Sequence, residues 1–93
     1  ASEFKIINNE EITVIDVRNK NELLSGMIPK SIHISLLNTT FKSKINKLDR
    51  SKTYIAYCKS GIRSARACQI MKKLGFEDVY NLKGGIQAWN KLN

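Results

Sequence analysis

The segment 57–64, Tyr-Cys-Lys-Ser-Gly-Ile-Arg-Ser, holds the residues best suited to chemistry in this sequence. Cys58 stands where a strand-like run meets a helical pattern, and Lys59 and Arg63 follow it closely. At a helix N-terminus, the helix dipole, free backbone N–H groups and nearby cations all lower the pKa of a thiol. Gly61 lets the chain turn tightly because it has no Cβ. We therefore predict that Cys58 is a thiolate nucleophile at neutral pH.

The second cysteine, Cys68, lies in a different setting. Small and apolar residues surround it in a helical pattern, so we predict an inert, packed thiol. A disulfide between Cys58 and Cys68 stays open, although ten residues of one helix span about 15 Å, which is too long for that bond. The sequence has no C-x-x-C pair and no second Cys/His pair, so it predicts neither a zinc site nor dithiol chemistry.

His33 is the only histidine and a second candidate for catalysis. It could act as the base that activates Cys58, as in a cysteine hydrolase. Nothing in the sequence places it near the segment 57–64, so we favour a structural role for this side chain.

The composition predicts one globular domain. The chain has 93 residues, of which 42% are hydrophobic and 26% charged, and this length suits a single domain over residues 1–93. No apolar run approaches the ~18 residues of a membrane span, and the first residues lack a signal-peptide pattern. We expect a cytoplasmic protein; a processed, secreted or periplasmic form and excision from a longer chain stay open.

The charge balance points to anionic ligands. Sixteen basic and eight acidic residues give a net charge of +8, which suits an anionic ligand or an acidic partner. The lysines are spread along the chain, and we find no helix-turn-helix, zinc-finger or aromatic strand motif. We therefore expect no nucleic acid partner.

Strand-like and helix-like runs alternate along the chain, which is typical of an α/β fold with a mainly parallel sheet. We expect strands at 11–16, 31–34, 52–57 and 79–82, and helices at 19–24, 36–48, 62–74 and 86–92. The strand at 52–57 is apolar on both faces, so we place it centrally. The inner face of the helix 62–74 is predicted at Ile62, Ala65, Ala67, Cys68, Ile70, Met71 and Leu74. Ligands bind at the carboxyl ends of parallel strands, which is where Cys58 stands.

Four segments, in order, resemble the motifs of rhodanese-like domains, a family of sulfurtransferases. The segment 58–64 resembles the active-site loop of the family, and 15–18 resembles its Asp-Val-Arg motif. The segment 22–31 resembles Glu…Gly-His-Ile-Pro, and 79–89 resembles the closing Leu-x-Gly-Gly…Trp. The four cover nearly the whole chain. The clear departure is Met27, where the family usually has His.

The resemblance implies a three-layer α/β/α fold and a two-step sulfur transfer. Cys58 would take a sulfane sulfur from thiosulfate or a persulfide donor and pass it to cyanide, a small thiol or an acceptor protein. Asp16 and Arg18 would support the site by packing and hydrogen bonding. The outer sulfur would be cradled by the backbone N–H groups of Lys59, Ser60, Gly61, Ile62 and Arg63. The Lys59 and Arg63 side chains would attract the anionic donor. We expect a monomer without cofactor or metal.

Two other functions are weighed against this one. Related phosphatases and arsenate reductases use a Cys-x5-Arg loop, whereas only four residues separate Cys58 from Arg63. The shorter loop should be too tight for phosphate. Many rhodanese-like domains are binding or regulatory modules, typically after loss of the cysteine, and the presence of Cys58 disfavours that alternative.

Overall fold

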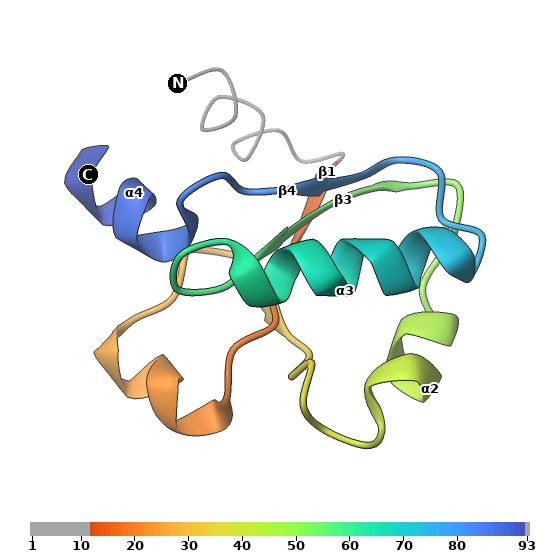
Figure 1. The fold of residues 1–93 in the computed structure, drawn as a ribbon, viewed down its shortest axis with the longest axis horizontal. Coiled ribbons are helices and arrows are strands. Elements are labelled where there is room, and N and C mark those ends of the chain that lie inside the picture. Colours follow the sequence, from red (N-terminus) through yellow and green to blue (C-terminus); the bar gives the residue numbers. More distant parts are fainter. Residues whose placement is uncertain (1–11, 93) are drawn as a thin grey trace.

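The computed structural model describes residues 12–92, which form a parallel four-stranded sheet with helices on both faces (Figure 1). The elements in chain order are β1 (Ile12–Asp16), the 3-10 helix η1 (Lys20–Ser25), β2 (Ile32–His33), α2 (Phe41–Asn46), β3 (Thr53–Tyr57), α3 (Ile62–Lys73), β4 (Val79–Asn81) and α4 (Gly85–Leu92). The strand order is β2-β1-β3-β4. The predicted α/β fold with a small parallel sheet is confirmed.

Strand β3 is central, as predicted, because it pairs with β1 on one side and β4 on the other. Its five residues are β-branched, aromatic or small, and Tyr54 through Tyr57 are buried. The register aligns Asp16 with Tyr57 and Ala56 with Asn81. The carboxyl ends of β1, β3 and β4 therefore meet at one edge of the sheet, and the Cys58 loop begins at that edge.

Side chains of alternate residues on the strands fill two separate cores, since successive residues of a strand face opposite sides. One core lies under α2 and α3 and includes Ile15, Ala56, Phe41, Ala67 and Met71. The other lies under α4 and includes Val14, Ile55, Tyr57, Leu82 and Ile86. Helix α3 packs along β3 and β4 (Figure 1). This is the three-layer arrangement that the resemblance to rhodanese-like domains implied.

The predicted helix at 36–48 is longer than the observed one. Helix α2 begins at Phe41 because Asn38 Oδ1 accepts hydrogen bonds from the backbone N and the hydroxyl of Thr40, which folds residues 36–40 into turns. Leu37, an apolar residue within the predicted helix 36–48, lies in these turns and is 68% exposed. The prediction for Ile62 is also wrong, since this first residue of α3 is 80% exposed. Glu11, the first residue of the predicted strand 11–16, lies outside the described residues.

The predicted stop of the helix before Gly75 is confirmed. Helix α3 ends at Lys73, and Gly75 follows with φ of +99°, a conformation that glycine adopts most readily. Within residues 12–92, none of the helices is both long and apolar enough to cross a membrane.

Candidate active site

Cys58 lies directly after β3, in the loop that leads into α3, and is 1% exposed. The backbone N–H of Gly61 donates a hydrogen bond to its Sγ at 3.1 Å. The Ser64 hydroxyl lies 3.5 Å from the same sulfur. Gly61 adopts φ of +108°, which folds the loop back over the thiol. The loop therefore directs hydrogen-bond donors at the sulfur.

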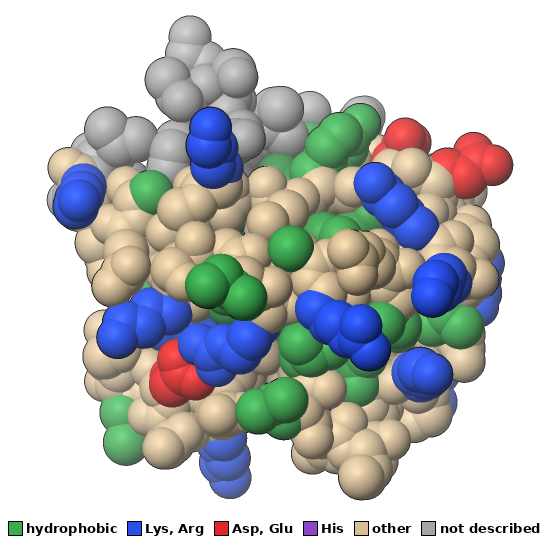
Figure 2. Space-filling view, in the orientation of Figure 1, with side chains coloured by type: hydrophobic (Ala, Val, Ile, Leu, Met, Phe, Trp, Pro, Cys, Tyr) green, Lys and Arg blue, Asp and Glu red, His purple; other side chains and the backbone are tan. Residues whose placement is uncertain are grey.

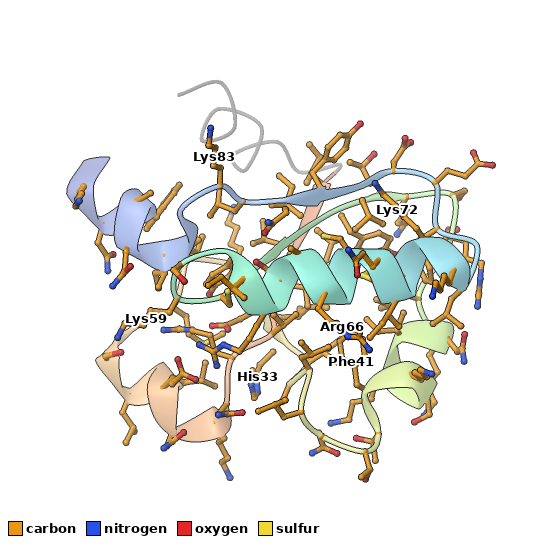
Figure 3. The ribbon with its side chains drawn as sticks, viewed as in Figure 1. His33, Phe41, Lys59, Arg66, Lys72 and Lys83 are labelled. Carbon is orange, nitrogen blue, oxygen red and sulfur yellow. The ribbon has the colours of Figure 1, made fainter. Side chains whose placement is uncertain are left out.

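These donors set the ionisation of Cys58. Burial raises the pKa of the thiol, but hydrogen bonds from the Ser64 side chain and from the backbone N–H groups of Ser64, Gly61 and Ser60 outweigh it, and the pKa is lowered. The predicted direction is confirmed, and hydrogen bonding is the main cause. Lys59 is exposed, and Figure 3 places it on the loop at the end of α3 that faces η1.

Ser64 and Asn81 are two site residues that the sequence analysis missed. Ser64 is fully buried on the first turn of α3, and its hydroxyl donates a 2.5 Å hydrogen bond to Asn81 Oδ1. The amide nitrogen of Asn81 donates to the Gly61 carbonyl oxygen at 3.0 Å. Asn81 ends β4, the neighbour of β3, and a polar residue at such a strand end was the signal that could have found it. Through these bonds, β4 fixes the loop around Cys58.

Helix α4 holds the loop from the other side. The backbone N–H of Ile86 donates to the Cys58 carbonyl at 2.9 Å, and that of Gln87 donates to the Lys59 carbonyl at 3.2 Å. A Cβ on Gly85 would lie 2.5 Å from the Lys59 carbonyl oxygen and would also overlap that of Cys58. Only glycine lets the two segments approach so closely.

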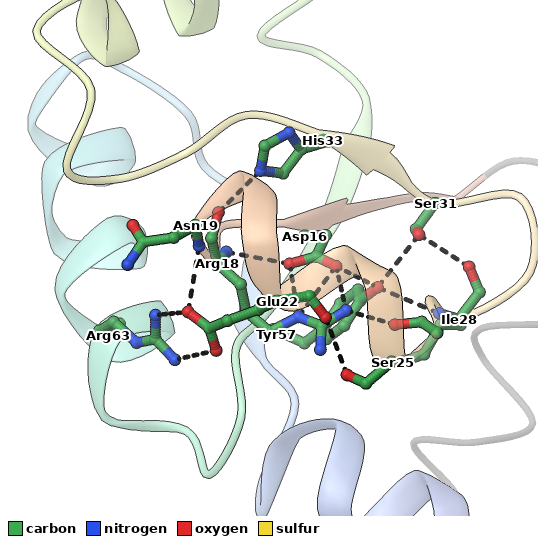
Figure 4. A network of polar contacts seen from close by, with 11 residues as sticks. Asp16, Arg18, Asn19, Glu22, Ser25, Ile28, Ser31, His33, Tyr57 and Arg63 are labelled. Carbon is green, nitrogen blue, oxygen red and sulfur yellow. Dashed lines mark hydrogen bonds and ion pairs between the residues drawn. The ribbon is translucent and has the colours of Figure 1, made fainter.

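Arg63 forms a bidentate ion pair with Glu22 of η1 (Figure 4). The two bonds measure 2.5 and 2.9 Å, and the backbone N–H of Asn19 donates to the same carboxylate at 3.2 Å. The hydrogen bond from Arg63 lowers the pKa of Glu22 to about 2. The same bond raises the pKa of Arg63, and the nearby charge of Cys58 raises it further. Arg63 is therefore held by Glu22 on one side and is electrostatically coupled to Cys58.

Asp16 and Arg18 form a buried pair behind the loop (Figure 4). Asp16 accepts bonds from the backbone and guanidinium of Arg18 and, at 2.8 Å, from the Tyr57 hydroxyl. Arg18 donates to the Gly26 carbonyl at 2.6 Å, and Tyr57 accepts the N–H of Ile28 at 3.1 Å. The pair thus anchors residues 26–28 at the carboxyl edge of the sheet, next to the strand end that carries Cys58.

The remaining candidates lie elsewhere. His33 Nε2 is 2.7 Å from the Arg18 carbonyl oxygen. Cys68 is buried in α3, and burial raises the pKa of its thiol to about 11. Both cysteines are free, so they form no disulfide with each other. Among the described residues, no three or more His, Cys, Asp and Glu side chains cluster as a metal site would need.

A buried cysteine with hydrogen-bond donors around its sulfur, at the carboxyl edge of a parallel sheet, thus marks the candidate site of this α/β protein. The sequence model of the rhodanese-like domain matches residues 4–92, and the chain belongs to that family. YtwF of Bacillus subtilis, whose name presents it as a candidate sulfurtransferase, is 40% identical over 96% of this chain and 84% of its own length. A thiosulfate sulfurtransferase, GlpE of Shewanella oneidensis, is 30% identical over 90% and 81%.

The solved structures agree with this assignment. A rhodanese-related protein of Thermoplasma volcanium superposes with a TM-score of 0.83 and 34% identity, covering 97% of this chain and 85% of that one. The three-layer fold described above is thus the fold of the family.

Proposed function

We propose that this protein is a sulfurtransferase that carries a sulfane sulfur as a persulfide on Cys58. The Gly61 N–H and the Ser64 hydroxyl beside Cys58 Sγ are the observation that supports it most, because such donors lower the pKa of the thiol and stabilise its thiolate form. The similarity to a protein named a thiosulfate sulfurtransferase supports thiosulfate as a donor.

In the first step, the Cys58 thiolate attacks the outer sulfur of thiosulfate. The S–S bond of thiosulfate breaks, its electron pair leaves with sulfite, and a Cys58 persulfide anion remains. The backbone N–H groups of residues 59–63 would bind the new terminal sulfur, since backbone donors in such a turn bind anions. The exposed Lys59 side chain would attract the dianionic donor, while Arg63, paired with Glu22, would add less to that attraction and would help to hold the loop.

In the second step, a nucleophile such as cyanide or a thiolate attacks the terminal sulfur of the persulfide. The S–S bond to Cys58 breaks, and the Cys58 thiolate is regenerated. The acceptor leaves as thiocyanate or as its own persulfide. No proton has to move in either step when both nucleophiles are anions, so the mechanism needs no general base at Cys58.

The alternatives fit this geometry less well. A phosphatase of the Cys-x5-Arg type needs an arginine to hold phosphate oxygens, whereas Arg63 is bound by Glu22 through both of its terminal nitrogens. A purely binding module gives no reason for a buried cysteine with a lowered pKa.

Intact mass spectrometry after incubation with thiosulfate tests the proposal directly. The wild-type protein should gain the mass of one sulfur atom, and cyanide should remove it. Cys58→Ser should gain nothing, while Cys68→Ser should behave as wild type. Sulfur uptake by Cys58→Ser, or equal losses in both variants, would overturn the assignment to Cys58.

A further inference from the structure

A polar pocket of about 400 Å³ lies beside the site and has no part in the chemistry described so far. Its polar lining comes from the start of η1, from β2 and the turns after it, and from α2. These residues are Asn19, Lys20, His33, Ser35, Asn38 and Lys44. Figure 3 shows His33 below α3, between the ribbons of η1 and α2.

The charge of this pocket suits an anion. Lys20 and Lys44 are both exposed, and no carboxylate is among the described residues that line the pocket. The neighbouring carboxylate, Glu22, is already bound by Arg63. Figure 2 shows basic side chains spread over the face that carries α3, with few acidic ones among them. A small anion should therefore concentrate here.

Hydrogen bonds outside the pocket fix how two of its polar side chains are oriented. Asn38 Oδ1 accepts from Thr40, so the amide NH2 group is the end of Asn38 left to donate. His33 Nε2 donates to the Arg18 carbonyl, because a carbonyl can only accept, and Nδ1 is left as the second polar atom of the ring. The pocket thus offers amide and ammonium donors of the kind that bind carboxylate oxygens.

The pocket adjoins the Cys58 loop through a single carboxylate oxygen. The backbone N–H of Asn19, on the pocket rim, and Nη1 of Arg63 both donate to Glu22 Oε1. Arg63 in turn lies close enough to Cys58 for the thiolate charge to raise the pKa of its guanidinium. A ligand the size of a tripeptide spans roughly 10 Å. Such a ligand could hold its charged end in the pocket while its thiol approaches the loop.

We propose that this pocket binds the carboxylate end of a small anionic thiol that accepts sulfur from Cys58. The acceptor role rests on the proposed sulfurtransferase function. The thiolate of the bound molecule attacks the terminal sulfur of the Cys58 persulfide, the S–S bond to Cys58 breaks, and the acceptor leaves as a persulfide anion. Lys20 and Lys44 neutralise the charge of the acceptor during this approach.

The test compares glutathione with its diethyl ester, which keeps the thiol and lacks both carboxylate charges. The preformed persulfide is mixed with each thiol, and its loss is followed by mass spectrometry, with rates expressed per thiolate. Wild type should react faster with glutathione, and the double variant Lys20→Ala/Lys44→Ala should lose about three- to tenfold of that advantage, as expected for exposed charge contacts. Lys52→Ala/Lys91→Ala removes the same charge from two exposed lysines that do not line the pocket, one before β3 and one on α4, and this variant should keep the advantage of glutathione. Equal rates for the two thiols in wild type, or equal losses in both double variants, would overturn the proposal.

A binding measurement separates this proposal from the proposed function. S-methylglutathione cannot accept sulfur, and its binding to Cys58→Ser is measured by calorimetry with and without the Lys20→Ala and Lys44→Ala changes. Weaker binding in the lysine variants supports the pocket whether or not Cys58 carries sulfur. Binding that is unchanged by the lysine variants rejects the pocket even if the persulfide forms. Absence of a persulfide on wild type rejects the proposed function and, with it, the acceptor role of the ligand.

Discussion

The Ser64 hydroxyl donates a 2.5 Å hydrogen bond to the Asn81 side-chain oxygen while it lies 3.5 Å from Cys58 Sγ. A hydroxyl has one proton, so Ser64 can donate to Asn81 or to the sulfur but not fully to both. With the proton directed at Asn81, the Ser64 oxygen can accept the S–H of a neutral thiol. When Cys58 ionises, rotation of the hydroxyl supplies a donor to the thiolate. Asn81 therefore competes with Cys58 for the proton that stabilises the reactive form.

Ser64→Ala should raise the pKa of Cys58, because it removes the donor while burial remains. The pH profile of persulfide formation should move to higher pH, and the rate at pH 7 should fall by roughly tenfold, near the lower end for a hydrogen bond to a charged group. Stopped-flow mixing with thiosulfate at a series of pH values measures the rate of persulfide formation. Ser43→Ala, which removes an exposed hydroxyl on α2, is the control. An unshifted profile in Ser64→Ala would mean that this hydroxyl does not act on Cys58.

Gly85→Ala should unfold the protein more easily than Gly26→Ala does. Both glycines have positive φ, but a Cβ on Gly26 meets nothing within 4 Å, whereas one on Gly85 overlaps the Cys58 loop. Gly26→Ala should cost about 1–3 kcal/mol from backbone strain alone. Gly85→Ala should lower the free energy of unfolding by about 1–3 kcal/mol more than Gly26→Ala does, because its Cβ overlaps the loop. Urea denaturation measures both variants, and equal costs would show that α4 does not clamp the loop.

Lys59→Ala should weaken thiosulfate binding. The side chain is exposed at the carboxyl end of β3, so its charge should raise the local concentration of the dianion more than it affects the chemical step. KM should rise severalfold with a smaller change in kcat, and the effect should shrink in high salt. Lys52→Ala removes the same charge just before β3, at the opposite end of the strand, and should leave KM nearly unchanged. A rise of equal size in both variants would assign the effect to net charge rather than to Lys59.

The position of Cys58 could be predicted because it depends on neighbours in the sequence. A β-branched and apolar run before it and a helical pattern after it suffice to place the cysteine at a strand-to-helix turn. The β-branched run 11–16 likewise predicts that Asp16 ends a strand, and the observed register pairs it with Tyr57, the residue before Cys58.

The side-chain partners of the site could not be predicted in the same way. Ser64 and Asn81 are 17 residues apart, and Arg63 and Glu22 are 41 residues apart. Such pairs form only after the sheet and η1 are packed, so no local pattern specifies them. Periodicity also failed for Ile62, which fits the apolar pattern of α3 but is exposed at the first position of the helix.

The Glu22–Arg63 pair should make stability depend on pH in the acid range. Arg63 lowers the pKa of Glu22 from 4.5 to about 2 in the folded protein, so the ionised carboxylate stabilises the fold above pH 4.5. This contribution should be lost as the pH falls from about 4.5 to about 2. It should amount to about 1 kcal/mol, because the pair is partly exposed and screened by solvent. Glu22→Gln should be less stable than wild type at pH 7, and the two should converge near pH 2 in urea denaturation.

Glu77→Gln provides the control for that experiment, since Glu77 is exposed. The free energy of unfolding of Glu77→Gln should match that of wild type at every pH from 7 down to about 2. A difference between wild type and Glu22→Gln that stays constant down to pH 2 would show that the carboxylate charge is not the source of the stabilisation.

The two cysteines should differ in reactivity although neither is exposed. Cys58 is 1% and Cys68 7% exposed, so access alone would slightly favour Cys68. Ionisation acts the other way, because hydrogen bonds lower the pKa of Cys58 against the effect of its burial, while burial raises the pKa of Cys68 to about 11. The thiolate is the form that reacts. Iodoacetamide at neutral pH, followed by peptide mass mapping, should therefore label Cys58 first and Cys68 hardly at all. The rate at Cys58 should also titrate at a lower pH than that of a free cysteine. Faster labelling of Cys68 would mean that access rather than ionisation governs the two thiols, and the loop would then give Cys58 no advantage as a nucleophile.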